Sequence, residues 1–178
     1  MTGKAIALTA PWELKFIDGG PTLPTTSTQQ TLGTWTAIGG NDTKIFSGTA
    51  QYSTSLPKPT IQSPAWLLDL GNVGESAEVL LNNKSLGKLL GPSYQLVIPT
   101  SLLKDANLLQ VNVTNGMANR IADLDKRGVE WKKFYNVNFP SRLPANRNAN
   151  GIFDASAWTP KPSGLMGPVT ITPISIER

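Results

Sequence analysis

The 178-residue chain contains neither cysteine nor histidine. These two absences exclude a disulfide framework, a thiol nucleophile, a Ser-His-Asp triad and the usual zinc sites. Any metal bound here would be a hard cation on oxygen ligands, with calcium as the expected choice and no other cofactor implied. The lack of cysteine fits the cytosol as well as an exported bacterial protein.

Long apolar runs and a leader segment are also missing. The chain has no stretch of about eighteen apolar residues, the length needed to span a bilayer. It has no basic segment followed by an apolar one, so we expect no signal peptide and no membrane partner. With 39% hydrophobic residues, the chain fits a single domain spanning 1–178.

Positive charge is in small excess, with 16 Lys and Arg against 12 Asp and Glu. A nucleic-acid surface would need a basic track. The basic residues are instead scattered between strand-like runs or interleaved with Asp123, Asp125 and Glu130 in the last third of the chain. Interleaved signs favour a salt-bridged loop, and we expect no nucleic-acid partner.

Alternation of apolar and polar residues with period two recurs along the chain and predicts many short strands. The Asn82-Asn83-Lys84 segment between two such runs indicates a tight hairpin. With no sustained helical period, the sequence predicts an all-β fold, an antiparallel β-sandwich. Eight residues are expected between its sheets: Trp12, Leu14, Tyr52, Leu68, Val79, Leu109, Val111 and Ile171.

A long irregular loop, about residues 115–165, interrupts the strand pattern. It is much longer than ordinary connections, which indicates a functional role. The loop contains the flat rings and planar hydrogen-bonding groups that sugar binding requires. The candidate ligand-binding residues are Asn119, Arg120, Asp123, Arg127, Trp131, Arg142, Asp154 and Trp158.

The carboxylates of this loop allow three interpretations. Glycosidic hydrolysis needs two carboxyl groups about 5 to 10 Å apart, and Asp123, Asp125, Glu130 and Asp154 are candidates. Alternatively, Asp123 and Asp125 pair with Arg120 and Arg127 and only hold the loop in shape. The Asp-x-Asp pair could also begin a calcium site, although no third ligand follows at a fitting spacing.

Four sequence segments resemble known glycosidase domains. Residues 75–87 (Glu-Ser-Ala-Glu-Val-Leu-Leu-Asn-Asn-Lys-Ser-Leu-Gly) and 102–111 (Leu-Leu-Lys-Asp-Ala-Asn-Leu-Leu-Gln-Val) resemble the sugar-binding jelly roll of glycoside hydrolase family 2. Asn83 and Ala106 stand where that pattern has Gly. The Ala-Asn-Arg-Ile at 118–121 and the Pro-Ser-Gly-Leu-Met-Gly-Pro-Val at 162–169 resemble the C-terminal sandwich of family 106 α-L-rhamnosidases.

The resemblance implies a galactose-binding-like jelly roll that is a non-catalytic, carbohydrate-binding or accessory module in polysaccharide degradation. Its partners would be a plant-type or bacterial polysaccharide and the catalytic barrel of a parent enzyme, which we expect to be bacterial and periplasmic or extracellular. By the same resemblance, Asp154 and Trp158 match residues that reach toward the substrate pocket. The alternatives are a small polysaccharide-acting enzyme that uses loop carboxylates and a general interaction or adhesion sandwich.

Overall fold

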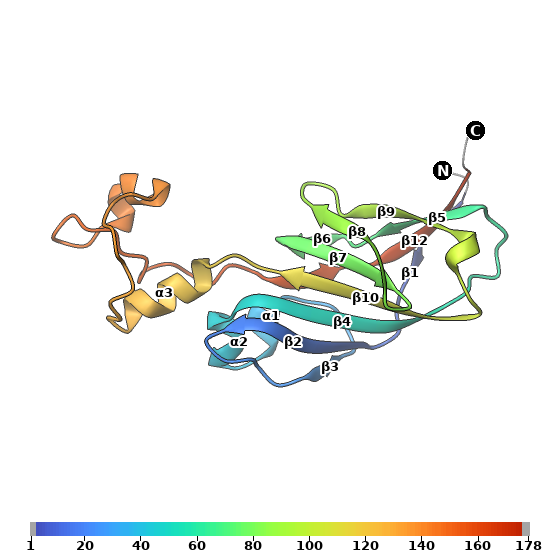
Figure 1. The fold of residues 1–178 in the computed structure, drawn as a ribbon, viewed down its shortest axis with the longest axis horizontal. Coiled ribbons are helices and arrows are strands. Elements are labelled where there is room, and N and C mark those ends of the chain that lie inside the picture. The colour runs from blue at the N-terminus through green and yellow to red at the C-terminus, as the bar shows by residue number, and fades with distance from the viewer. Residues whose placement is uncertain (1–2, 176–178) are drawn as a thin grey trace.

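The structure, a computed structural model, describes residues 3–175. Its strands form two antiparallel sheets that pack against each other as a sandwich (Figure 1). The larger sheet has the order β3-β2-β4-β10-β7-β8 and the smaller one β1-β12-β5-β9, while β11 and β6 form a separate two-stranded ribbon. The predicted antiparallel sandwich is therefore confirmed.

The elements have the following bounds. The strands of the larger sheet are β3 (Ser27–Gln29), β2 (Trp12–Gly20), β4 (Ser47–Pro57), β10 (Ala106–Thr114), β7 (Ser76–Leu81) and β8 (Lys84–Leu90). The other strands are β1 (Ile6–Ala7), β12 (Thr170–Ile174), β5 (Ala65–Asp69), β9 (Gln95–Pro99), β11 (Gly164–Gly167) and β6 (Asn72–Gly74). The helices are α1 (Trp35–Ile38), α2 (Asn41–Ile45), α3 (Ala118–Lys126) and the 3-10 turns η1 (Thr100–Leu102), η2 (Phe139–Arg142) and η3 (Pro144–Asn146).

The alternation of apolar and polar residues places the apolar side chains in the core, as predicted, because successive side chains of a strand point to opposite faces of its sheet. All eight residues expected between the sheets are buried: Trp12, Leu14, Tyr52, Leu68, Val79, Leu109, Val111 and Ile171. Trp35, at the start of α1, joins them and packs edge to face against Phe16 and Phe46. The hairpin between β7 and β8 turns on Asn82 and Asn83, both with positive φ.

The prediction of an all-β chain is confirmed in part, because the fold within residues 3–175 is mostly β but also contains three α-helices. The longest, α3, occupies the start of the segment predicted to be irregular. Its buried side chains are Asn119 and Ala122, so its inner face is partly polar. A helix of nine residues makes only about two and a half turns, which is too short for the sequence to show a sustained helical period.

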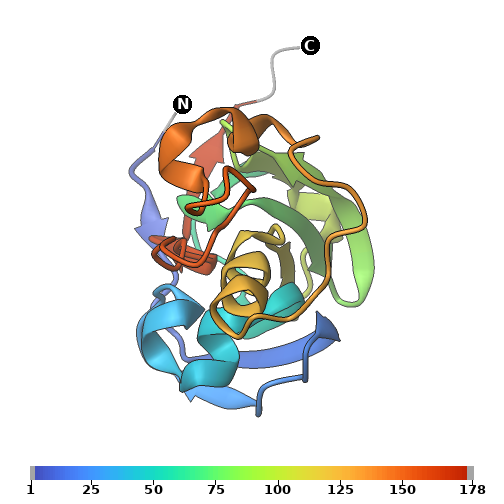
Figure 2. The same cartoon turned by 90° about the vertical axis from the view of Figure 1, so that its left-hand side faces the viewer.

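Residues 117–162, here called the arm, project from one end of the sandwich. Figure 1 shows α3 and the following loop at the end opposite to the one where the described residues start and finish. Viewed from that end, α3 and the loop lie in front of the sheets (Figure 2). The arm thus extends beyond the sandwich, while α3 stays in contact with α2 and β4.

Candidate functional site

Three polar side chains fix both ends of the arm to the sandwich and are called the neck here: Asn115, Ser163 and Thr34. Buried Asn115 donates its amide hydrogens to the Phe46 carbonyl at 3.0 Å and to Ser163 Oγ at 3.1 Å. The Ser163 amide in turn donates to Thr34 Oγ1 at 2.8 Å. The points where the chain leaves and re-enters the sandwich are therefore fixed to each other and to the start of α1.

Gly164 follows the neck and passes between core aromatics. Its φ is +108°, and a Cβ here would lie 2.4 Å from the Tyr52 hydroxyl oxygen and 2.9 Å from Trp35 Cε3. Only glycine adopts this backbone conformation without strain and leaves room for both rings. The Pro-Ser-Gly-Leu block noted in the sequence therefore anchors the returning end of the arm.

The base of the arm is closed by Asn119, one of the predicted ligand-binding residues. Its side-chain amide donates to the Lys161 carbonyl at 3.0 Å, and its Oδ1 accepts from the Lys161 amide at 2.7 Å. The side chain thus pairs with the returning backbone as a neighbouring strand would. Asn119 is buried, so its hydrogen-bonding groups are already used within the arm.

Asp125 organises the middle of the arm. One carboxylate oxygen accepts from Trp131 Nε1 at 2.7 Å and from Lys132 Nζ at 2.6 Å, and the other accepts from the Ala155 amide at 2.8 Å. Its side chain is only 4% exposed. Lys132 Nζ also lies 5.1 Å from the Trp131 ring centre and 5.5 Å from that of Phe153. One buried carboxylate therefore connects three segments of the arm.

The predicted pairing of Asp123 and Asp125 with Arg120 and Arg127 is confirmed in part. Asp123 binds Arg127 at 2.9 Å across one turn of α3. Asp125 binds Lys132 instead, and Arg120 turns back toward the sandwich, with Nη1 2.7 Å from where a Gly20 Cβ would be. Within residues 3–175, no group of three or more acidic side chains could hold a metal ion.

The other predicted residues lie in the part of the arm that follows α3. Trp158 Nε1 donates to Asn146 Oδ1 at 2.8 Å, and its ring meets Phe153 edge to face. Arg142 lies over the Phe139 ring, 5.2 Å from its centre. Hydrogen bonds from the Ser156 hydroxyl and amide lower the pKa of Asp154, so its carboxyl stays ionised at neutral pH.

Three hollows mark the surface of the arm. One of about 150 Å³ at its base brings together Asn119, Asp123 and Trp158. A second of about 260 Å³ contains Asp154 beside Tyr135, and a third of about 410 Å³ contains Trp131. Arg120, Arg127 and Arg142 line none of the three. The eight predicted residues thus share the arm but do not converge on one pocket.

Sequence reasoning did not single out Asn115, nor the role of Asp125 as the centre of the arm. Asn115 directly follows the last residue of β10, a position where an amide side chain often bonds to neighbouring backbone. The partners of Asp125 are six, seven and thirty residues away. No local spacing rule identifies such contacts.

The chain is similar to fragments of large glycosidases, whereas no family model matches it. It is 31% identical to a candidate β-glucuronidase of Formosa agariphila over 97% of this chain but only 16% of that protein. A rhamnosidase from Novosphingobium sp. PP1Y aligns at 26% identity and a TM-score of 0.73, over 96% of this chain and 15% of its own. A GH2 β-galacturonidase from Eisenbergiella tayi shares the fold at 17% identity and a TM-score of 0.52, with 24% of its chain covered.

None of the helices within residues 3–175 is long and apolar enough to cross a membrane.

Proposed function

We propose that this chain is a non-catalytic accessory domain of a multidomain glycoside hydrolase, in which it supports or extends a glycan-binding surface. The observation that carries the proposal is the match of almost the whole chain to about one sixth of much longer glycosidases. The proposal includes a jelly-roll, galactose-binding-like topology, which the two packed antiparallel sheets support. It also includes a bacterial parent enzyme that is exported to the periplasm or the medium.

Three of the four candidate carboxylates of the arm support a role other than catalysis. Asp123 and Asp125 are each held in an ion pair, and the Asp154 carboxylate accepts hydrogen bonds from Ser156. A glycosidase needs one carboxyl group that is protonated at working pH, usually with a raised pKa. The pKa of Asp154 is shifted in the opposite direction.

Sugar contact by the arm centres on the hollow that contains Asp154. Tyr135, Asn148 and Lys132 line the same hollow, so it offers a ring face, an amide and a cation beside this carboxylate. These groups suit the apolar face and the hydroxyls of a pyranose. Because a shallow site exchanges water hydrogen bonds for sugar ones, we expect dissociation constants of about 10 μM to 1 mM.

The test combines hydrolysis and binding. The 178-residue chain should not release aryl groups from aryl β-glucuronides, β-galacturonides or α-L-rhamnosides. Isothermal titration with oligosaccharides that contain these sugars should show weak binding that Asp154→Ala and Tyr135→Ala reduce. Lys84→Ala, at the exposed first residue of β8, is the matched control. Turnover abolished by Asp123→Asn or Asp154→Asn would contradict the proposal and favour a stand-alone enzyme.

A further inference from the structure

The outer face of the larger sheet carries polar side chains across five strands. Five of them lie opposite one another in β2, β4, β10, β7 and β8 and are called the polar row here: Lys15, Gln51, Asn112, Glu78 and Lys88. In the first four of these strands the residues on either side are buried, so the side chains of the row point away from the core. Since neighbouring strands lie about 4.8 Å apart, the polar row is about 19 Å long.

Hydrogen bonds hold the middle of the polar row in one arrangement. Gln51 Nε2 donates to Asn112 Oδ1 at 3.0 Å, and Asn112 Nδ2 donates to Glu78 Oε2 at 3.4 Å. The other Glu78 oxygen accepts from Ser85 Oγ at 2.9 Å. Gln51 Oε1 accepts from Gln110 Nε2 at 3.2 Å. Because each amide has a second hydrogen and each oxygen a further lone pair, the row presents additional donors and acceptors at fixed positions.

A hollow of about 330 Å³ opens on the same face. Asn112, Glu78 and Lys88 of the polar row line it. The neighbouring row contributes three hydroxyl groups: those of Thr49, Thr114 and Ser76. Leu90 of the edge strand β8 also lines the hollow and is 74% exposed. The hollow thus combines amide, carboxylate, ammonium and hydroxyl groups with an exposed apolar side chain.

The charges on this face nearly cancel. The strand register places three acids and two lysines on it: Glu13, Asp18, Glu78, Lys15 and Lys88. The positive excess of the chain lies in the arm instead, because residues 117–162 contain eight of the 16 Lys and Arg but only four of the 12 acids. A polyanion needs a surface with an excess of positive charge. The sheet face therefore favours a ligand without net charge.

The distribution of polar groups also favours a sugar over a protein. Protein interfaces have an apolar, often aromatic centre and a polar rim. In this hollow the amide, carboxylate and hydroxyl groups come from β4, β10 and β7, inside the sheet, whereas Leu90 comes from the edge strand. A sugar hydroxyl both donates and accepts hydrogen bonds, so it matches a surface on which donors and acceptors alternate.

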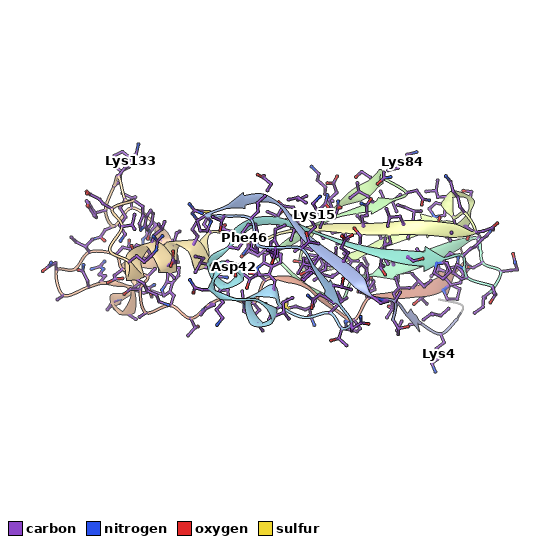
Figure 3. The ribbon with its side chains drawn as sticks, turned by 90° about the horizontal axis from the view of Figure 1, so that it is seen from below. Lys4, Lys15, Asp42, Phe46, Lys84 and Lys133 are labelled. Carbon is purple, nitrogen blue, oxygen red and sulfur yellow. The ribbon has the colours of Figure 1, made fainter. Side chains whose placement is uncertain are left out.

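We propose that the polar row and its hollow bind a neutral oligosaccharide. Its length of about 19 Å suits an extended chain of several sugar units. Figure 3 shows Lys15 on the sandwich and Lys133 at the far end of the arm, so this surface adds a second contact to the one in the arm. The inference rests on the function proposed above only for the choice of a glycan as the ligand.

An NMR titration of the 178-residue chain with cellohexaose, xylohexaose and mannohexaose tests the site. We expect saturable shifts of the side-chain amide signals of Gln51 and Asn112 with at least one of these neutral sugars. Gln95 is the internal reference, because its amide donates to Asp69 Oδ2 at 2.7 Å in the other sheet and should not shift. Absence of a saturable shift at Gln51 and Asn112 with all three sugars would overturn the inference.

Variants separate sugar contact from a general effect on the fold. Gln51→Ala and Asn112→Ala should each weaken binding about tenfold, because each removes an amide of the polar row and frees its neighbour. Gln95→Ala is the matched control, since it also removes an amide that is bonded to a carboxylate, and should leave the affinity unchanged. An unchanged backbone spectrum around Val111 shows that the sheet is intact. Equal affinity of all three variants would contradict the proposed contact.

The pattern of shifts distinguishes this inference from the arm site. Shifts at Gln51 and Asn112 support the sheet face, whether or not Tyr135 of the arm also responds. Shifts confined to Tyr135 and its neighbours overturn the sheet-face inference and leave the proposed function standing. Tighter binding of hexagalacturonate than of every neutral sugar at Gln51 and Asn112 also overturns it, because the ligand is then acidic.

Discussion

Replacing Asp125 with alanine should open the arm while the sandwich stays folded. The Asp125 side chain is 4% exposed and that of its partner Lys132 16%, so the pair is largely removed from water. Removing one member of a buried pair costs about 3 to 5 kcal/mol, because the remaining charge is left without compensation. Trp131 Nε1 and the Ala155 amide lose their acceptor in the same step.

Asp123→Ala is a matched control on the same helix. Asp123 also accepts a hydrogen bond from a cationic side chain, that of Arg127. The Arg127 side chain is 53% exposed, and the pair spans one turn of α3. Exposed pairs at this spacing contribute about 0.3 to 0.5 kcal/mol. Both substitutions place alanine in α3, so the change in helix propensity is the same in the two variants.

Hydrogen exchange measured by NMR reads the effect at single groups. A loss of about 3 kcal/mol corresponds to exchange about a hundredfold faster, since each 1.4 kcal/mol is a factor of ten. We expect this acceleration at the Ala155 amide and the Trp131 indole hydrogen in Asp125→Ala, with the Val111 amide in β10 unchanged. Equal acceleration in both variants, or at Val111, would refute the reasoning.

Three further substitutions test the neck, the base and the outer loop of the arm. Gly164→Ala should lower the free energy of unfolding, measured by heat or denaturant, by more than about 3 kcal/mol, because strain at positive φ adds to a clash in the core. Gly128→Ala, at φ +65° with open space around it, should lower it by only about 1 to 2 kcal/mol. Asn119→Asp should destabilise the arm base by about 1 to 3 kcal/mol, since an oxygen replaces the amide that donates to the Lys161 carbonyl. Equal stability of the variant and the original chain would show that this pairing does not hold the arm base closed. Ser156→Ala should raise the pKa of Asp154 in a carboxyl-carbon NMR titration. Because the folded pKa is lowered, the stabilisation by this contact is complete above the unfolded value of about 3.9 and is lost as the pH falls through the folded value.

The strands could be predicted from the sequence because each depends on a pattern within a few neighbouring residues. Trp12, Leu14 and Phe16 alternate with exposed residues and are all buried, and the Asn82-Asn83 turn needs only residues that tolerate positive φ. Antiparallel neighbours joined by short turns then follow from pattern alone.

The position of the arm could be predicted from the sequence. Its side-chain contacts could not, because they join residues that are far apart in the chain. Asp123 and Arg127 form the expected kind of pair, yet the spacing of four acquires meaning only once α3 is known to be a helix. Asp125 reaches Lys132 and Ala155 across loops whose course no propensity fixes. The aromatic and polar content indicated an interaction surface, whereas the partners of each side chain depended on the fold.

Strands β1 and β12 lie side by side, with Ile6 opposite Ile171 and Gly3 against Pro173. The two ends of the described chain thus lie in one small area, a geometry that would allow a domain of this kind to be inserted into a loop of a host protein with little distortion of either. A circular permutant that joins the two ends through a short glycine linker and opens the chain at Ala149, an exposed loop residue of the arm, should therefore retain the sandwich. Such a permutant would divide the arm into two free ends and leave every strand intact.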